Sequence, residues 1–342
     1  MCIRDSNLRF DEVLASTPRF EVGLRVPFDK PGTLDAQYDA LHQEALAVRA
    51  RAAEEARRVA LDVRVALARY HGWKALVHVA ATERGLAQAE VDRLRAGVAS
   101  KAVGAVELAA AELALIEADG GVARAEGEAA RWHAVIAAAI GTCALPEAAV
   151  DGWRDEVVPG ERDALVKTAL SERPSLRRYA ALAGIAAARR WEANAQAWPW
   201  LDWVQVGYEL TDPIVTDTWV FSLAIDIPIA NWDGAHVRAA EAEERAVKEA
   251  ARRDVAAIVA EVDAALAEWR ACVDTLAALE RTRAGFDEAR LATLERAAQQ
   301  GTADPDDIFK IKRDLGRIER RRVEALIALR EARARVLAAI AR

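Results

Sequence analysis

The same order of segments occurs twice in this chain, and the duplication limits the folds that it can adopt. Residues 22–28 and 223–229 are each apolar at every second position and each contain a proline. Each is followed by a glycine, Gly32 or Gly234, and then by a long helical pattern. Self-similarity of this kind indicates two copies of one unit, built from a strand, a long helix, a tight turn and a returning helix.

The helical segments carry apolar residues at alternating steps of three and four. The stripe in the first copy is Val59, Val63, Ala66, Tyr70, Trp73, Val77 and Ala80. The stripe in the second copy is Val255, Ile258, Val262, Ala265, Trp269, Cys272, Leu276 and Leu279, and the returning segment has Ile308, Ile311, Leu315, Ile318, Leu329, Val336 and Ile340. These a/d stripes predict long antiparallel coiled-coil hairpins, each helix of about 65 residues being roughly 100 Å long. A mainly α protein with a small β part is therefore expected.

Residues 198–229 have the period of strands instead. Apolar residues alternate through Val204, Val206, Tyr208 and Leu210, and again through Trp219, Phe221, Leu223, Ile225, Ile227 and Ile229. We expect strands at 200–210 and 219–229 with a turn between them. Ten-residue strands that are apolar on one face and bounded by aromatics are typical of membrane barrels, although a hairpin that covers a soluble core has the same pattern.

Composition excludes several classes of function. Charged residues make up 30 % of the 342 residues, but their signs are interspersed and the net charge is only -7, which argues against nucleic-acid binding. The three cysteines and five histidines do not have the spacing of a disulfide framework or a metal site. We see no nucleophile elbow, phosphate loop or catalytic carboxylate pair, so we expect no catalytic residues, no cofactor and no bound metal.

Three segments of the second copy resemble the TolC-like outer membrane efflux protein family, and the resemblance extends from about Phe20 to Arg342. Residues 173–177, Arg-Pro-Ser-Leu-Arg, resemble the family's Arg-Pro-Asp-Leu helix start. The strand 221–229 and the following Asp-Gly resemble the family's alternating strand, which ends in Leu-Pro-Leu-Phe and Asp-Gly. Residues 301–309 are similar to the family's turn Gly-Leu-Ala-Ser-x-x-Asp-Val-Leu.

The resemblance implies a homotrimer in the outer membrane. Three protomers would contribute four strands each to one 12-stranded β-barrel, and their helices would form an α-barrel tunnel through the periplasm. The duct would export cargo passively as part of a tripartite efflux or type I secretion system. Its partners would be a periplasmic adaptor protein, an inner-membrane pump and outer-membrane lipid.

The resemblance also assigns residues to sites. Asp307 matches the first position of an aspartate ring at the periplasmic gate, and Lys310 stands where a second aspartate would be; Asp307 equally suits an ordinary helix start. The adaptor-docking tips would be Gly97, Val98, Ala99, Ser100, Gly301, Thr302, Ala303 and Asp304. The membrane interface of the barrel would contain Trp198, Trp200, Trp203, Tyr208, Trp219 and Phe221.

The expected organisation is a truncated N-terminal segment, two repeats and an insert. The segment is 1–18, the first repeat 19–141 with its tip near 97–100, the equatorial insert 142–172, and the second repeat 173–342 with its tip near 301–304. The start of the chain lacks the apolar core of a signal peptide, so we expect a fragment without its signal peptide and first strand. Two alternatives are a periplasmic adaptor and a cytoplasmic coiled-coil scaffold.

Overall fold

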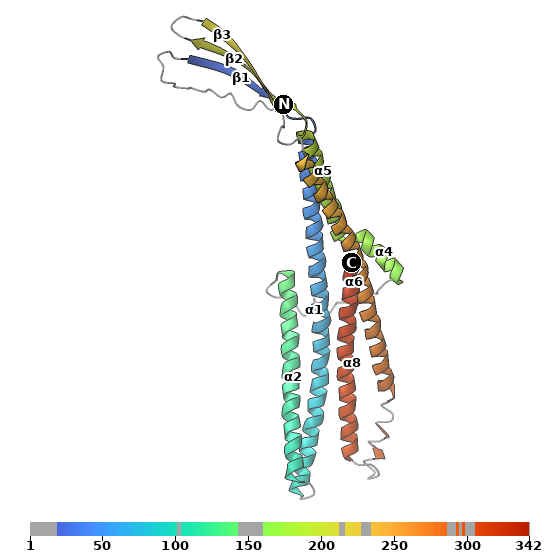
Figure 1. Cartoon of the computed structure of the whole chain (residues 1–342). Coiled ribbons are helices and arrows are strands. Elements are labelled where there is room, and N and C mark those ends of the chain that lie inside the picture. Colours follow the sequence, from blue (N-terminus) through green and yellow to red (C-terminus); the bar gives the residue numbers. More distant parts are fainter. Residues whose placement is uncertain are drawn as a thin grey trace. The chain divides into compact units, whose positions relative to one another are not determined.

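The computed structural model describes most of the chain. The described residues are 19–100, 104–142, 160–211, 216–226, 234–285, 292–293, 296–297 and 305–341. The elements are β1 (Arg19–Pro27), α1 (Thr33–Ala99), α2 (Ala105–Ile140), α4 (Arg162–Glu172), α5 (Pro174–Gln196), β2 (Trp200–Thr211), β3 (Thr216–Asp226), α6 (Ala235–Ala284) and α8 (Pro305–Ala339) (Figure 1). The protein is therefore mainly helical with a small sheet, as expected.

The chain divides into two compact units. The strand-bearing unit comprises Met1–Ala52 and Pro174–Val255, and the helical unit comprises Ala53–Arg173 and Ala256–Arg342. Helices α1 and α6 each begin in the strand-bearing unit and continue into the helical unit. In the parts of the chain that the structure describes, no helix has a stretch apolar and long enough to span a bilayer.

The sheet has the order β1-β2-β3, and both pairs of strands are antiparallel. A bulge between Leu201 and Trp203 adds one residue to β2, so Leu201 lies on the same face as Val204, and Trp200 on the same face as Trp203. The two strands expected at 200–210 and 219–229 correspond to β2 and β3. Strand β3 begins earlier than expected, at Thr216, and residues 227–229 lie outside the described part of the chain.

Three helical segments complete the strand-bearing unit, with α5 between the first part of α1 and the first part of α6. Gln37 of α1 donates a hydrogen bond of 2.9 Å to Glu192 of α5, and Ser175 of α5 donates one of 2.8 Å to Asp254 of α6. Gly32, just before α1, has a φ of 81°. A Cβ there would also lie 2.7 Å from the indole nitrogen of Trp191. Both the positive φ and the lack of space therefore disfavour any larger residue at this position.

The helical unit is a layer of antiparallel helices in the order α2, α1, α8, α6 (Figure 1). Ala66 and Tyr70 of α1 pack with Ile136 of α2, while Leu76 of α1 packs with Val323 of α8. Ion pairs cross every junction of the layer: Arg95–Glu112 at 2.9 Å between α1 and α2, Arg69–Glu331 at 2.5 Å between α1 and α8, and Arg283–Glu319 at 3.3 Å between α6 and α8. The predicted heptad seams hold this layer together.

Two helix ends differ from the sequence expectation. Helix α1 passes through Gly97 and ends at Ala99, because glycine costs a helix only about 1 kcal/mol and Val91 and Leu94 pack the same stretch against α2. The helical pattern of the second copy was expected to reach Gly301; α6 ends at Ala284, residues 292–293 and 296–297 are helical again, and the rest of 286–304 lies outside the described residues. The seam of α6 stops after Leu279, and its last turn has Arg281 and Arg283, which favour a helix C-terminus.

The C-terminus of α8 is held by two arginines. Arg57 donates to the carbonyl of Ala338 at 2.9 Å, and Arg173, whose side chain is only 4 % exposed, donates to that of Ala339 at 2.9 Å. These bonds satisfy carbonyls that a helix end leaves unpaired. Burial favours a higher pKa for the carboxyl of Glu54, but a hydrogen bond from Arg57 and the nearby guanidinium charges outweigh it and lower that pKa.

Candidate functional site

One face of the sheet is apolar and exposed. The register places Val22 opposite Tyr208 and Val206 opposite Phe221, so the apolar residues of all three strands share a face. The exposed members of this apolar face are Val22, Leu24, Trp219, Phe221, Leu223 and Ile225. Phe221 and Trp219 are 73 % and 63 % exposed. An exposed apolar patch of this size, on strands of 9, 12 and 11 residues, marks a surface that meets something other than water.

The opposite face is polar and contains small residues. Its described side chains include Arg25 on β1, Gln205 and Glu209 on β2, and Thr218 and Ser222 on β3. Gly23 lies opposite Gly207, which leaves bare backbone at the middle of the face. The sheet is therefore amphipathic, with one apolar face and one polar face.

The register divides the six aromatics that the resemblance assigned to a membrane interface. Tyr208, Trp219 and Phe221 lie on the apolar face, where the rings of Tyr208 and Trp219 are 5.1 Å apart. Trp200 and Trp203 belong to the polar face, since their partners are Asp226 and Ala224. Trp198 precedes β2 and is 74 % exposed. Alternation with Val204 already places Trp203 on the polar face, whereas Trp200 joins it there through the bulge in β2, which the sequence does not reveal.

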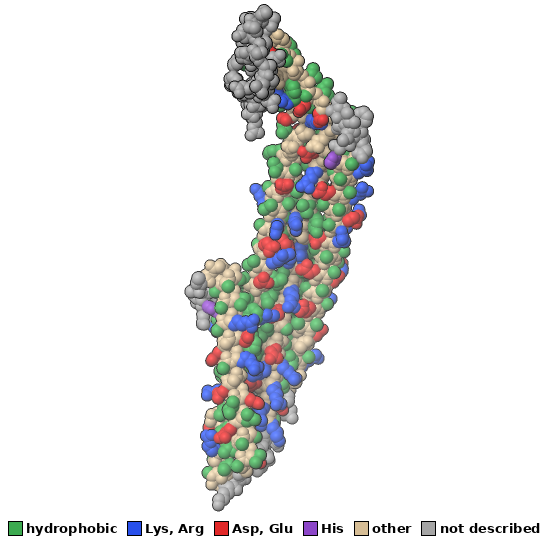
Figure 2. All heavy atoms as spheres, turned by 60° about the vertical axis from the view of Figure 1, so that its left-hand side comes forward, with side chains coloured by type: hydrophobic (Ala, Val, Ile, Leu, Met, Phe, Trp, Pro, Cys, Tyr) green, Lys and Arg blue, Asp and Glu red, His purple; other side chains and the backbone are tan. Residues whose placement is uncertain are grey.

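The two outer helices of the helical unit carry a second stripe each. On α2 one heptad stripe faces α1, and another, about half a turn away, is exposed: Val106, Ala109, Leu113, Ile116, Gly120, Ala123, Gly127, Ala130 and Ala134. On α6 the exposed stripe is Ala257, Ala260, Ala264, Ala267, Ala271, Asp274 and Ala278. Figure 2 shows acidic and basic side chains interspersed with apolar ones over the visible helices. Neither stripe was predicted, because only one apolar seam was expected on α6 and none was assigned on α2.

The two expected docking tips are described unequally. Gly97, Val98 and Ala99 form the last turn of α1, and Ser100 follows with its hydroxyl donating to the carbonyl of Gly97 at 2.9 Å. Gly301, Thr302, Ala303 and Asp304 lie outside the described residues.

The gate residues lie at the start of α8. Pro305 begins the helix and Asp307 is in its first turn, although the side chain of Asp307 is not described. Lys310 is exposed, and the neighbouring Ile308 is buried. Close by, the Arg93 guanidinium lies 5.3 Å from the ring of Phe309, which joins α1 to α8 at this level.

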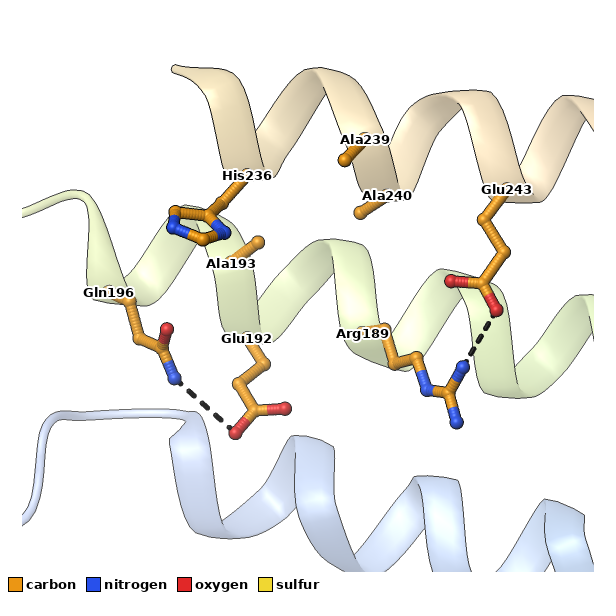
Figure 3. Close-up of a pocket in the computed structure, with 8 residues that line it drawn as sticks. All are labelled: Arg189, Glu192, Ala193, Gln196, His236, Ala239, Ala240 and Glu243. Atoms are coloured by element: carbon orange, nitrogen blue, oxygen red, sulfur yellow. Dashed lines mark hydrogen bonds and ion pairs between the residues drawn. The ribbon is translucent and has the colours of Figure 1, made fainter. Parts of the chain in front are cut away.

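Figure 3 shows an open groove between α5 and α6. Its residues are Arg189, Glu192, Ala193, Gln196, His236, Ala239, Ala240 and Glu243. Arg189 and Glu243 form an ion pair of 2.7 Å across it. Within the described ranges no three His, Cys, Asp or Glu side chains are grouped as metal ligands. The groove therefore offers a salt-bridged helix contact rather than a site for chemistry.

The solved structures that match this architecture include a transmembrane channel and outer-membrane proteins. CusC, described as forming a transmembrane channel, is 18 % identical with a TM-score of 0.75, over 98 % of this chain and 80 % of that one. VceC, an outer membrane protein of Vibrio cholerae, is 14 % identical with a TM-score of 0.73, over 95 % and 80 %. The open-state MtrE outer membrane channel of Neisseria gonorrhoeae is 19 % identical with a TM-score of 0.67, over 95 % and 76 %.

No family model and no curated protein matches the sequence. The structural likeness at these low identities establishes the fold, which is that of TolC-like outer membrane channels. The resemblance inferred from the three motifs is confirmed at this level.

Proposed function

We propose that this protein is the outer-membrane exit channel of an export system, and that it is not an enzyme. The observation that carries the proposal is the exposed apolar face of the sheet. Lipid can surround that face without cost, whereas leaving it in contact with water costs about 25 cal/mol for each Å² of apolar area. The strand lengths fit a bilayer crossed by tilted strands.

The functional unit in this proposal is a homotrimer. A three-stranded sheet has two open edges, which lipid does not tolerate, so several copies must join their sheets into one barrel. Four strands from each copy would give the 12 expected, and three of the four are described. The exposed stripes of α2 and α6 support the same assembly, because the α2 edge of one copy can pack on the α6 edge of the next and close a ring.

The trimer has a direct test on the α2 stripe. Ala123→Lys places a charge in the proposed seam, while Glu117→Lys places one at an exposed position of the same helix, about a third of a turn around the axis from Ala123. The chain, given an export signal, should be recovered from outer membranes as three copies in detergent by light scattering. Ala123→Lys should abolish the trimer and Glu117→Lys should not. A stable, water-soluble monomer of the unaltered chain would refute the proposal.

The proposed partners are a periplasmic adaptor protein at the helix tips and an inner-membrane pump that supplies the energy. At the tip of the α1–α2 hairpin, α1 passes through Gly97 and ends at Ala99, and the next residue, Ser100, is exposed. We expect Ser100→Trp to prevent adaptor capture in a pull-down while the trimer stays intact. Capture at wild-type strength would remove this tip from the docking surface.

At the periplasmic mouth, three copies of Asp307 would form an acidic ring that Lys310 partly neutralises. Asp307→Asn should reduce the cation preference of the reconstituted channel. An unchanged preference would leave Asp307 as a helix-start residue only.

A further inference from the structure

We propose that the polar face of the sheet contains two charged rings that set the ion selectivity of the pore, a cation-attracting ring at Glu209 and an anion-attracting ring at Arg25. The inference rests on the proposed function, because only a closed barrel brings three copies of each residue around one lumen. It concerns residues of the strands and is independent of the periplasmic gate.

The register places these side chains at defined levels of the same face. Arg25 lies opposite Gln205, which lies opposite Ser222. Glu209 lies between Glu21 of β1 and Thr218 of β3 in the register. On β1 the two levels are four positions apart, from Glu21 to Arg25, which corresponds to about 13 Å along a strand. The level of Glu209 is nearer the β2–β3 hairpin, and that of Arg25 is nearer the ends that lead to the helices.

Two glycines separate the charged levels. Gly23 and Gly207 are directly opposed, and a Cβ on Gly23 would lie only 3.1 Å from the amide nitrogen of Gln205. Val220 is the third residue of this level. Because two of its three positions lack side chains, water fills this level and each charged ring acts on ions separately.

The Arg25 charge is fixed at the wall. Its guanidinium lies 4.1 Å from the ring centroid of Trp203, in a cation–π contact on the polar face. Arg25 itself is exposed, so the stack positions the charge without removing it from water. Trp203 thus holds the arginine in place instead of meeting lipid.

The two rings have opposite effects on permeation. The acidic level attracts cations and repels anions at the hairpin end of the barrel, and the basic level does the reverse about 13 Å away. The basic ring is a barrier to small cations and the acidic ring is a barrier to small anions. The higher of the two barriers sets the ion preference of the pore.

The experiment measures the cation-to-anion permeability ratio of the purified full-length trimer in planar bilayers. Glu209→Gln should lower the ratio by about twofold or more, and Arg25→Gln should raise it by a similar factor. Thr218→Ala and Ser222→Ala are matched controls at the same two levels and should leave the ratio unchanged. Arg25→Lys keeps the charge but not the planar stack, and it should restore the wild-type ratio.

Salt dependence distinguishes an electrostatic effect from a distorted barrel. The Debye length falls from about 30 Å at 0.01 M salt to about 3 Å at 1 M, so the shifts should be large in dilute salt and disappear in 1 M salt. Equal permeability ratios for all variants in dilute salt, with intact conducting trimers, would overturn this inference and leave the channel proposal standing. Failure of the unaltered chain to form trimers or channels would instead refute the proposed function.

Discussion

The three-stranded sheet and the four-helix layer use apolar side chains in opposite ways. In the layer the apolar residues are confined to narrow seams, so that Val262 of α6 and Val336 of α8 are fully buried and ion pairs cross between the helices. In the sheet the largest apolar side chains point away from any core, and Phe221 is 73 % exposed. The difference shows that the layer buries its apolar side chains within itself, whereas the sheet leaves an apolar face exposed, which under the proposed function would meet lipid.

A charge placed on the apolar face should have the largest effect. Phe221→Arg puts a guanidinium where lipid is proposed, which costs about 2–4 kcal/mol in each copy near the bilayer midplane. Ser222→Arg makes the same change one residue later, on the polar face, and should be tolerated. Recovery of each variant from outer membranes, followed by denaturant unfolding of the membrane-bound protein, measures the difference. Equal losses for both variants would mean that the two faces do not meet different solvents.

Close packing inside the layer is expected to have a smaller effect. A Cβ on Gly72 of α1 would lie 2.0 Å from Cγ1 of Ile327 on α8, whereas one on Gly85 of the same helix would meet no described atom within 4 Å. Gly72→Ala should destabilise the layer by about 1–3 kcal/mol through overpacking. Gly85→Ala should stabilise it by about 0.5–1 kcal/mol, because alanine is the better helix former. Guanidinium unfolding of the two variants checks this, and a stabilising Gly72→Ala would show that α1 and α8 do not approach so closely.

Sequence reasoning predicted the parts of this fold that follow from a repeated local pattern. The alternation on β2 and β3 and the heptad stripes identified the apolar face and the seams, and Ala66 and Tyr70 are buried as the stripe requires. Val59, in the same stripe, is 46 % exposed, because a stripe shows which side of a helix is apolar but not where its partner begins.

The remaining features depend on contacts between distant residues. Nothing near Arg173 in the sequence reveals that it binds a carbonyl 166 positions away. The bulge that moves Trp200 to the polar face is likewise visible only once β2 is paired with β3. The adaptor tip and the gate rest on the family resemblance, and they stay predictions.

The smallest expected effect concerns pH and the charges that hold the end of α8. The pKa of the Glu54 carboxyl is lowered from its ordinary value of 4.5, so the folded state binds its proton less readily than the unfolded chain. The ion pair with Arg57, at 2.6 Å, therefore contributes stability above about pH 4.5, and that contribution is lost as the pH falls through the lower folded pKa. A partly exposed pair of this kind contributes about 0.2–1 kcal/mol. Glu54→Gln should be less stable than the wild type by that amount at neutral pH, and the difference should shrink steadily in unfolding curves recorded below pH 4.5. A difference for Glu54→Gln that is constant with pH would mean that the carboxyl only fills space beside Arg57.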